Sequence, residues 1–553
     1  MKKAVLLTGL MSVMMPAMIS AQSLAVPGVS PSNPLAILTV PETSIAMKGI
    51  EGSAFGRAML ARHAAFWASP QNAAARDQFA ATSQTLGIDL TPPRFLVDQV
   101  KGFDLYVVEI DSFQNYVLAL QMRDPAVADK VLGHITQEAA GASGVSGGFR
   151  ADTVVERTVT KGRTIYLPAF EMYFADLEGG ILVYSTNQKA LESALSDDGR
   201  AMFTSAYFDR FSKGLPKNET APWMLGELDR LSPIISSVTG LPDFVTAQIL
   251  PPSGATQLAA GVDRLEITTF IPQTELKGEP RRYALAAPPA SRVAFSDMVP
   301  ANPLVGYATA HFDGIAFLDA ALAMIDSLPG RAGTGEKVNK GLEESRGELG
   351  FDPRTDLLAT LGPDMAIYLS EFTPAEDPTG MPKAFSGVFV AGVRDEARFT
   401  RIVKLLEERL SPPPPTPKSK DEPAPTPVNP IQTEQFQGIA IRSVASPPVS
   451  WALTSDRFYV GTSTVAIKEA IDVAADPAKA QTSTDSWKVA SAVQDASRTS
   501  VLGASGSRFA SLFPTLPAEW QAVLTAAEYV SVSTTYRTEG KKQQLVVLTA
   551  PAK

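Results

Sequence analysis

The stretch LGFDPRTDLLATLGPDMAIYL, residues 349–369, has a counterpart in LGIDLTPPRFLVDQVKGFDLYVV, residues 86–108. Each begins where a helical pattern ends, at a Leu-Gly pair whose glycine suits the left-handed conformation of a helix C-terminus. Each then continues into a segment with strand-forming composition, over 366–369 in the later copy and 105–110 in the earlier one. This recurrence predicts that the chain is organised as two similar modules.

Other elements recur in the same order around these stretches. A β-branched strand pattern over 33–40 has its counterpart at 302–309. A capped helix is expected after Thr186-Asn187 and again after Thr462-Ser463. A strand that ends in Arg-Asp and runs into a helix occurs over 116–139 and again over 386–410, and aspartate at that position caps the free amides of a helix. Meandering strands with single inserted helices predict the α+β class, with two tandem homologous modules, each a mainly antiparallel sheet with helices packed on it.

Composition sets the expected boundaries. We expect the first module over 33–275, a linker over 276–300 and the second module over 301–550. The Pro-rich segment 411–430 has the composition of an extended linker. Because strands that should complete the second module follow it, we interpret it as an insertion loop within that module; a Pro-rich ligand for a binding partner is the alternative.

The N-terminus has the pattern of an export signal. Two lysines precede an apolar run over 4–19, and small residues end at Ala21. A membrane anchor is the alternative, but the run is shorter than the ~20 residues a span requires. We expect residues 1–21 to be a signal peptide and 22–32 a lead-in, which predicts a periplasmic or extracellular protein with no membrane span after cleavage.

Composition also excludes several function classes. The 553 residues include no cysteine, so disulfides, thiolate metal sites and thiol nucleophiles are excluded. The net charge is −9, and it becomes more negative when the two lysines of the leader are removed. A negative protein repels the phosphates of nucleic acids, so we expect no nucleic-acid partner.

Three histidines limit the possible His-centred chemistry. His134 and Glu138 stand four residues apart on an expected helix and could share a metal ion, although His134 also fits the edge of the buried stripe. His63 is expected to face solvent on an amphipathic helix, and His311 ends a strand. We therefore predict no metal site.

Two loops partly match catalytic motifs. Gly144–Gly148 fits the G-x-S-x-G pattern, but it lies between a helix and a strand, whereas a hydrolase places its serine on a strand-to-helix turn. Gly330–Lys337 is close to a phosphate-binding loop, with Glu336 where lysine is required. Neither match predicts a site.

Aspartates near the recurring stretch are the remaining candidates. Asp352, Asp356 and Asp364 cluster there, with Asp89 in the earlier copy. A glycosidase uses two carboxylates across a cleft, whereas turns and caps also favour aspartate. The ionisable residues of the two copies mostly do not match, so we predict no catalytic, cofactor-binding or metal-ligating residue and no cofactor.

The chain resembles exported bacterial families of unknown function built from two duplicated α+β modules. The similarity is carried by the Leu-Gly-aromatic-Asp unit at 349–352, Leu357-Leu358, Leu361-Gly362 and the unit at 86–89. It implies an envelope or secreted protein. We expect a non-enzymatic protein that binds an unknown protein or envelope component; the alternatives are an exported hydrolase with paired Asp/Glu carboxylates and a small-ligand carrier.

Overall fold

The computed structural model describes 25–26, 29–31, 34–109, 115–142, 155–159, 162–167, 172–196, 210–211, 214–216, 221–231, 253–261, 263–276, 294–310, 314–315, 318–319, 322, 326, 333–373, 384–410, 431–445, 448–510 and 518–549. The expected signal peptide 1–21, the Gly144–Gly148 match, His311 and the Pro-rich segment 411–430 lie outside these residues.

The described residues contain twenty strands, which belong to one sheet. In the first half of the chain they are β1 (Ala36–Val40), β2 (Val100–Glu109), β3 (Asn115–Met122), β4 (Val155–Val159), β5 (Gly162–Leu167), β6 (Met172–Leu177), β7 (Ile181–Ser185), β8 (Trp223–Gly226), β9 (Gly254–Ala260) and β10 (Arg264–Pro272). In the second half they are β11 (Val305–Thr309), β12 (Leu361–Thr373), β13 (Ala384–Val393), β14 (Gln432–Phe436), β15 (Ile439–Ala445), β16 (Pro448–Leu453), β17 (Arg457–Gly461), β18 (Ser500–Ser505), β19 (Ala527–Arg537) and β20 (Gly540–Thr549).

Helices alternate with these strands along the chain. The α-helices are α2 (Thr43–Gly52), α3 (Ala54–Ala68), α4 (Ala73–Leu86), α5 (Pro92–Gln99), α6 (Pro125–Ala142), α7 (Gln188–Leu195), α14 (Thr334–Leu349), α15 (Glu396–Leu410), α16 (Thr464–Ala475), α17 (Asp485–Val493), α18 (Gly506–Phe509) and α19 (Ala518–Ala526). Shorter turns include η6 (Ala294–Met298), η7 (Pro353–Leu357) and η10 (Gln481–Ser483).

The fold corrects the expectation of two tandem modules, each with its own sheet. That expectation is wrong, because the described strands form a single antiparallel sheet. The chain divides into two compact units, Met1–Ala287 with Phe513–Glu528 and Tyr536–Lys553, and Pro288–Leu512 with Tyr529–Thr535. Local sequence patterns show where strands occur, but they do not record that the last strand of the chain returns to the first unit.

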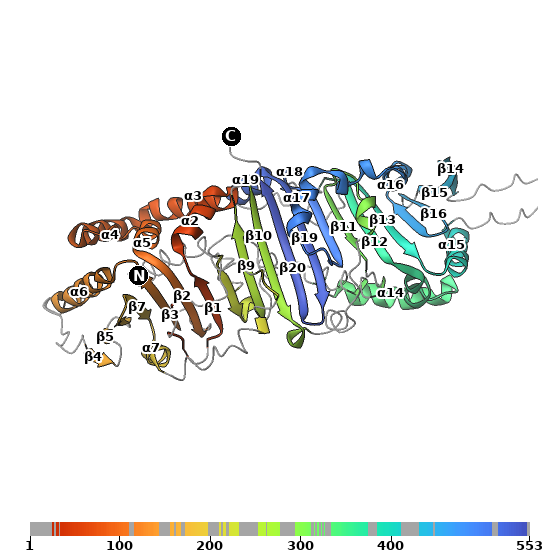
Figure 1. The fold of residues 1–553 in the computed structure, drawn as a ribbon. Coiled ribbons are helices and arrows are strands. Elements are labelled where there is room, and N and C mark those ends of the chain that lie inside the picture. Colours follow the sequence, from red (N-terminus) through yellow and green to blue (C-terminus); the bar gives the residue numbers. More distant parts are fainter. Residues whose placement is uncertain are drawn as a thin grey trace, which may run out of the picture. The chain divides into compact units, whose positions relative to one another are not determined.

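In the first unit the strands follow the order β4-β5-β6-β7-β3-β2-β1-β8-β9-β10-β20. Strands β9, β10 and β20 run side by side although β20 comes from the end of the chain (Figure 1). The last pairing is long, from Arg264 opposite Leu548 to Pro272 opposite Gly540. The C-terminal strand is therefore an integral part of the first unit.

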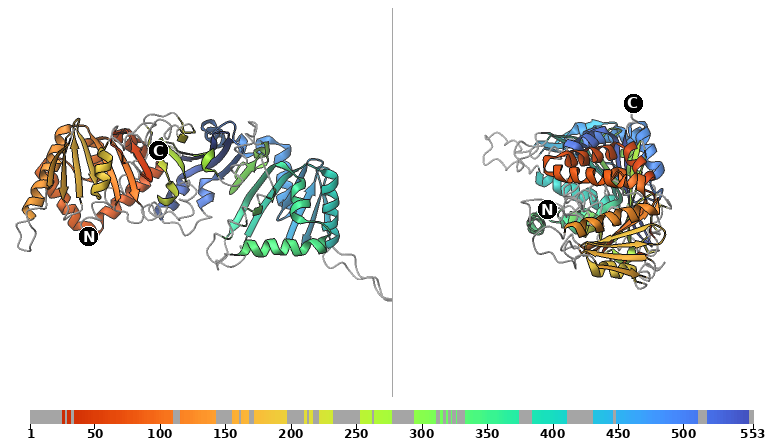
Figure 2. Two further views of the ribbon diagram at one scale, coloured as in Figure 1. Left: turned by 90° about the horizontal axis from the view of Figure 1, so that it is seen from below. Right: turned by 90° about the vertical axis from the view of Figure 1, so that its left-hand side faces the viewer.

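In the second unit the order is β14-β15-β16-β17-β13-β12-β11-β18-β19. Helix α14 runs beside α15 (Figure 2). Phe399 and Val403 of α15 pack with Met365 of β12 and Ala391 of β13 in one hydrophobic core. Ala366 and Tyr368 lie on the other face of β12, since successive side chains of a strand point to opposite faces.

The first unit buries both faces of its sheet. One core includes Leu38, Phe103 and Leu118, and the other includes Ile37, Tyr106 and Val117. Successive side chains of a strand therefore point into different cores. This explains why the sequences of these strands are nearly continuous apolar runs rather than alternating apolar and polar residues. Helix α6 contributes to the first core, whereas α7 and the residues Ala25, Val26 and Val29 contribute to the second.

Several local predictions are confirmed. Gly87 and Gly350 end α4 and α14 in the left-handed conformation, with φ of 66° and 75°. Asn187 and Ser463 cap α7 and α16 by accepting hydrogen bonds from backbone amides three residues later. The chain contains no cysteine and combines helices with strands, and none of the helices in the described ranges has the length and apolarity needed to cross a bilayer.

Candidate functional site

Asp104 is a carboxyl group without solvent exposure in the middle of β2. Its Oδ1 accepts a hydrogen bond from the Ala25 amide (3.0 Å), and its Oδ2 accepts one from the Val26 amide (2.8 Å). Burial raises the pKa of Asp104 to about 6, although these amides and the nearby Thr39 and Tyr106 side chains oppose the rise. Ala25 and Val26 belong to the N-terminal segment, whose described residues are 25–26 and 29–30. This segment therefore supplies hydrogen bonds that a buried carboxylate requires.

Asp104 belongs to a polar row that crosses six neighbouring strands of the first unit. Each member is directly opposite the next in the strand pairing, and each is at most 6% exposed. In spatial order the polar row consists of Asp104, Thr39, Trp223, Gln257, Thr268 and Gln544. The row lies on the sheet face that also carries Tyr106, because Asp104 and Tyr106 are two residues apart.

The polar row has a physical consequence for strand pairing. A shift of one residue in any of these strands would move its polar side chain to the opposite, apolar core. For β2 such a shift would place Asp104 among residues such as Leu38 and Phe103, where its carboxylate would lose the amides of the N-terminal segment. The row therefore favours one strand register at the cost of burying polar groups.

The side-chain amide of Gln257 in the row retains unused hydrogen-bonding capacity. Among the described residues, Nε2 of Gln257 has no hydrogen-bond partner and is buried. The Asp104 carboxylate already accepts two backbone amides, so the Gln257 amide is a group of the row that could donate to a polar ligand.

The row does not provide a pair of catalytic acids. The nearest acidic strand residue to Asp104 on the same face is Glu266 of β10. Glu266 forms an ion pair with Arg264 (2.7 Å), and burial raises the pKa of Glu266. Strands β1, β8 and β9 lie between β2 and β10, which separates the two carboxylates by about 19 Å at about 4.8 Å per strand. Acid pairs of glycosidases are roughly 5–10 Å apart.

The aspartates near the recurring stretch serve the backbone. The Asp352 carboxylate accepts hydrogen bonds from the amides of Arg354 (2.9 Å) and Thr355 (3.2 Å), which lowers its pKa. Asp356 accepts one from the Asp352 amide (2.8 Å) and forms an ion pair with Arg398. The interpretation of these two residues as caps is confirmed.

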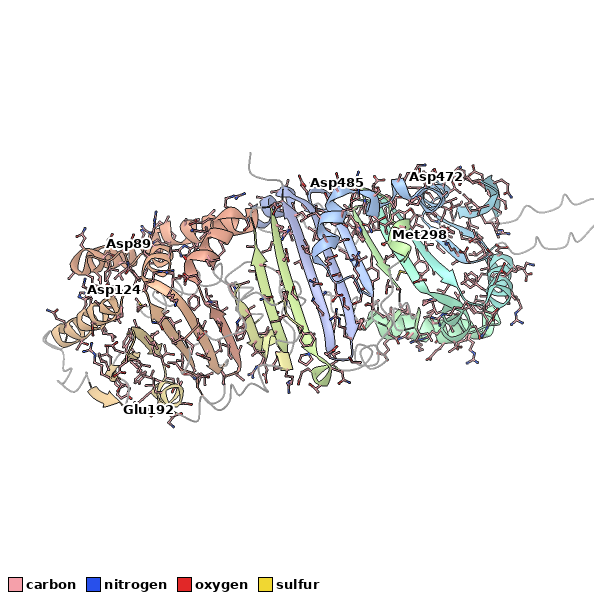
Figure 3. All side chains as sticks on the ribbon, viewed as in Figure 1. Asp89, Asp124, Glu192, Met298, Asp472 and Asp485 are labelled. Atoms are coloured by element: carbon pink, nitrogen blue, oxygen red, sulfur yellow. The ribbon has the colours of Figure 1, made fainter. Side chains whose placement is uncertain are left out.

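Two further aspartates also lie at helix starts. Asp89 accepts a hydrogen bond from the Thr91 amide (2.8 Å) just before α5, and Asp124 accepts one from the Ala126 amide (2.9 Å) at the start of α6 (Figure 3). Asp364 lies half-buried on β12. The carboxylates of Asp89 and Asp124 thus stabilise the starts of two separate helices.

The histidines are not brought together in the described residues. The prediction that His63 faces solvent is wrong: it is 7% exposed, its ring stacks on Trp67, and burial lowers its pKa. Helix α3 packs against α2 and α19, which covers a face that the sequence indicated as exposed. His134 is half-buried, and the side chain of Glu138 lies outside the described residues, so their pairing stays a prediction. Within those residues no group of three metal-binding side chains occurs.

The described part of the segment Gly330–Lys337, which partly matches a phosphate-binding loop, forms the start of α14. Gly333 has a φ of 78°, and α14 begins at Thr334. The amide of Gly335 donates a hydrogen bond to Oδ1 of Asp326 (2.8 Å). A carboxylate of the chain thus takes an amide that a phosphate would need.

The second unit contains a different polar cluster on the Tyr368 face of β12. Tyr368 lies opposite Gly306, Gly306 opposite Gly503, and Gly503 opposite Ser531. We call this set the glycine hollow. Among the described atoms, the Tyr368 hydroxyl and Nε2 of Gln481 are buried without a hydrogen-bond partner.

Neighbouring side chains fill the glycine hollow. A Cβ atom at Gly306 would lie 2.3 Å from Cγ1 of Val299, and one at Gly503 would lie 2.0 Å from the Tyr529 hydroxyl. That hydroxyl also donates to Oε1 of Gln481 (3.4 Å). The hollow is therefore occupied by protein atoms and retains two unused polar groups.

The sequence reasoning did not single out Asp104 or Gln257. A signal was present at Asp104, because a charged residue interrupts the apolar run from Phe103 to Val108. In a strand with both faces buried, such a residue must have a specific partner. The other members are ordinary strand residues, and their alignment follows from the pairing alone.

No family model, curated protein or solved structure matches the chain.

Proposed function

We propose that the protein is an exported, non-enzymatic protein that acts by binding a component of the cell envelope. The supporting observation is the position of the residues just after the expected leader. Val26 is 0% and Val29 1% exposed, and the Ala25 and Val26 amides bind Asp104. The chain thus joins the core of the first unit within a few residues of Ala21, the expected cleavage position.

Binding accounts for the polar chemistry better than hydrolysis. Both oxygens of Asp104 accept backbone amides, and Asp352, Asp356, Asp89 and Asp124 accept amides at turns and helix starts. A general acid must instead lie within reach of a substrate atom. These carboxylates maintain the fold, so we assign the protein a binding role.

A small-ligand carrier is the second candidate. Neighbouring side chains fill the glycine hollow, so the observation that favours a carrier is limited to two buried donors without partners in the described residues, the Tyr368 hydroxyl and Gln481 Nε2. Buried donors of this kind commonly bind an ordered water or a polar ligand. The native protein would then release a small polar molecule on denaturation, which mass spectrometry can detect.

The proposed function is tested by expressing the full chain with a C-terminal tag in a bacterial host and fractionating the cells. We expect envelope or medium localisation and an N-terminus at Gln22 by sequencing. A cytoplasmic chain that retains residues 1–21 would overturn the export proposal. Turnover of an envelope polymer that is lost in Asp104→Asn or Glu266→Gln variants, with folding intact, would replace the binding proposal by hydrolysis.

A further inference from the structure

The N-terminal segment, described at residues 25–26 and 29–30, forms contacts with the first unit that are typical of a bound peptide. Its Ala25 and Val26 amides donate to Asp104, and the Tyr106 hydroxyl donates to the Val29 carbonyl (2.7 Å). The Ser30 amide donates to the carbonyl of Ala194 at the end of α7 (3.2 Å). Main-chain groups are thus recognised at both ends of the segment, as in peptide recognition by side chains and helix ends.

Two aliphatic side chains complete this recognition. Val26 and Val29 are buried in the core that contains Ile37, Tyr106 and Val117. They are three residues apart, so the segment presents apolar groups at positions i and i+3. The site therefore recognises amides, a carbonyl and two aliphatic side chains, which together define a short peptide as ligand.

The receiving surface belongs to the sheet itself. Asp104 and Tyr106 lie on β2, which pairs with β1 on one side and with β3 on the other. The described hydrogen bonds of the segment go to side chains of β2 and to α7, and none of its described residues belongs to a strand. The sheet can therefore provide the site before the segment is bound.

The second unit shows what this face looks like without the carboxylate. Ala366 lies opposite Ala308, and Tyr368 lies two residues after Ala366, as Tyr106 follows Asp104. In the second unit the apolar residue Ala366 thus occupies the position that Asp104 occupies in the first unit. Asp104 occurs where the covering segment is the N-terminal part of the chain and supplies two amides.

We propose that the Asp104–Tyr106 face of β2 is a peptide-binding site, and that its ligand is the protein's own N-terminal segment. The ligand class is a short peptide with two free amides at its start and aliphatic side chains at i and i+3. The proposal goes beyond the proposed function, because the ligand belongs to the chain itself and not to the cell envelope. The described residues of its occupant are 25–26 and 29–30.

The test uses the whole chain with residues 32–33 replaced by a specific protease site. Cleavage converts the N-terminal segment into a free peptide within an otherwise complete protein. We expect the peptide to stay bound during gel filtration, and to exchange with a fluorescent synthetic peptide of residues 22–31. Loss of the peptide on the time scale of the column, with circular dichroism unchanged, would overturn the proposal. Unfolding of the nicked protein would also overturn it, since the segment would then be an inseparable part of the core.

Variants identify the recognition groups. Asp104→Ala should raise the dissociation rate of the peptide at least tenfold, and Tyr106→Phe should raise it several-fold. Asp124→Ala, which removes an exposed cap at α6, is the matched control and should leave the rate unchanged. A synthetic peptide with Val26→Asp requires no change in the protein and should not compete. Equal rates in wild type, Asp104→Ala and Tyr106→Phe would overturn the site, whereas the localisation result above would stand independently.

Discussion

Asp104 and Thr39 face each other across β2 and β1, and both side chains are fully excluded from solvent. Burial raises the pKa of Asp104 to about 6 in the folded protein, against about 3.9 in an unfolded chain. The folded state therefore binds this proton more tightly than the unfolded state. The stabilisation is complete below the unfolded pKa and is lost as the pH rises through about 6.

Asp104→Asn tests this linkage. The raised pKa corresponds to about 3 kcal/mol in total, of which about 2 kcal/mol develops between about pH 7.5 and 4.5. In urea denaturation we expect the free energy of unfolding of the wild type, relative to Asp104→Asn, to increase by that amount on acidification. A constant difference between the two proteins over this range would show that Asp104 does not titrate with a raised pKa.

Tyr106 and Tyr368 allow a comparison of how much a buried hydroxyl contributes to the free energy of unfolding with and without a hydrogen-bond partner among the described atoms. The Tyr106 hydroxyl binds the Val29 carbonyl, so Tyr106→Phe should lower the free energy of unfolding by about 1 kcal/mol. The Tyr368 hydroxyl has no partner among the described atoms, so Tyr368→Phe should be neutral or slightly stabilising. Equal destabilisation by both substitutions would indicate a ligand or bound water at Tyr368.

Gly503 and Gly341 give a second matched pair. A methyl group at Gly503 would lie 2.0 Å from the Tyr529 hydroxyl, so Gly503→Ala should destabilise by about 1–3 kcal/mol through overpacking. Gly341 lies within α14 with nothing within 4 Å of the same position, and Gly341→Ala should stabilise by about 0.5–1 kcal/mol. Thermal denaturation measures both; a neutral Gly503→Ala would mean that the glycine hollow has spare space.

Asp352→Ala should lower the melting temperature at neutral pH, because the carboxylate caps the amides of Arg354 and Thr355. These hydrogen bonds lower the pKa of Asp352. Its contribution is therefore present above the unfolded pKa and is lost as the pH falls, opposite in sign to that of Asp104. The melting temperatures of wild type and variant should converge in acid; a constant gap would point to lost packing instead.

Local features of the fold could be predicted from the sequence. Gly87, Gly350, Asn187 and Ser463 act at helix ends as expected. Their signals depend on backbone groups within a few residues, so a short window of sequence is sufficient. Helix α5 was not predicted, although two prolines mark its first positions.

Long-range pairing could not be predicted in the same way. The polar row depends on six strands that meet only in the folded protein, and Gln544 joins it through the pairing of β20 with β10. Neither Gln257 nor Gln544 differs in its local sequence from an ordinary strand residue. Helix α3, which carries the buried His63, likewise packs against α19, a helix distant in the chain.

The pairing of β20 with β10 also determines when the first unit can be completed during synthesis. The ribosome finishes β10 at Pro272, but β20 begins only at Gly540. Throughout that interval β10 pairs with β9 on one side and exposes the hydrogen-bonding groups of its other edge, which can associate with other nascent chains. The chain should therefore depend on a holding chaperone until translation ends.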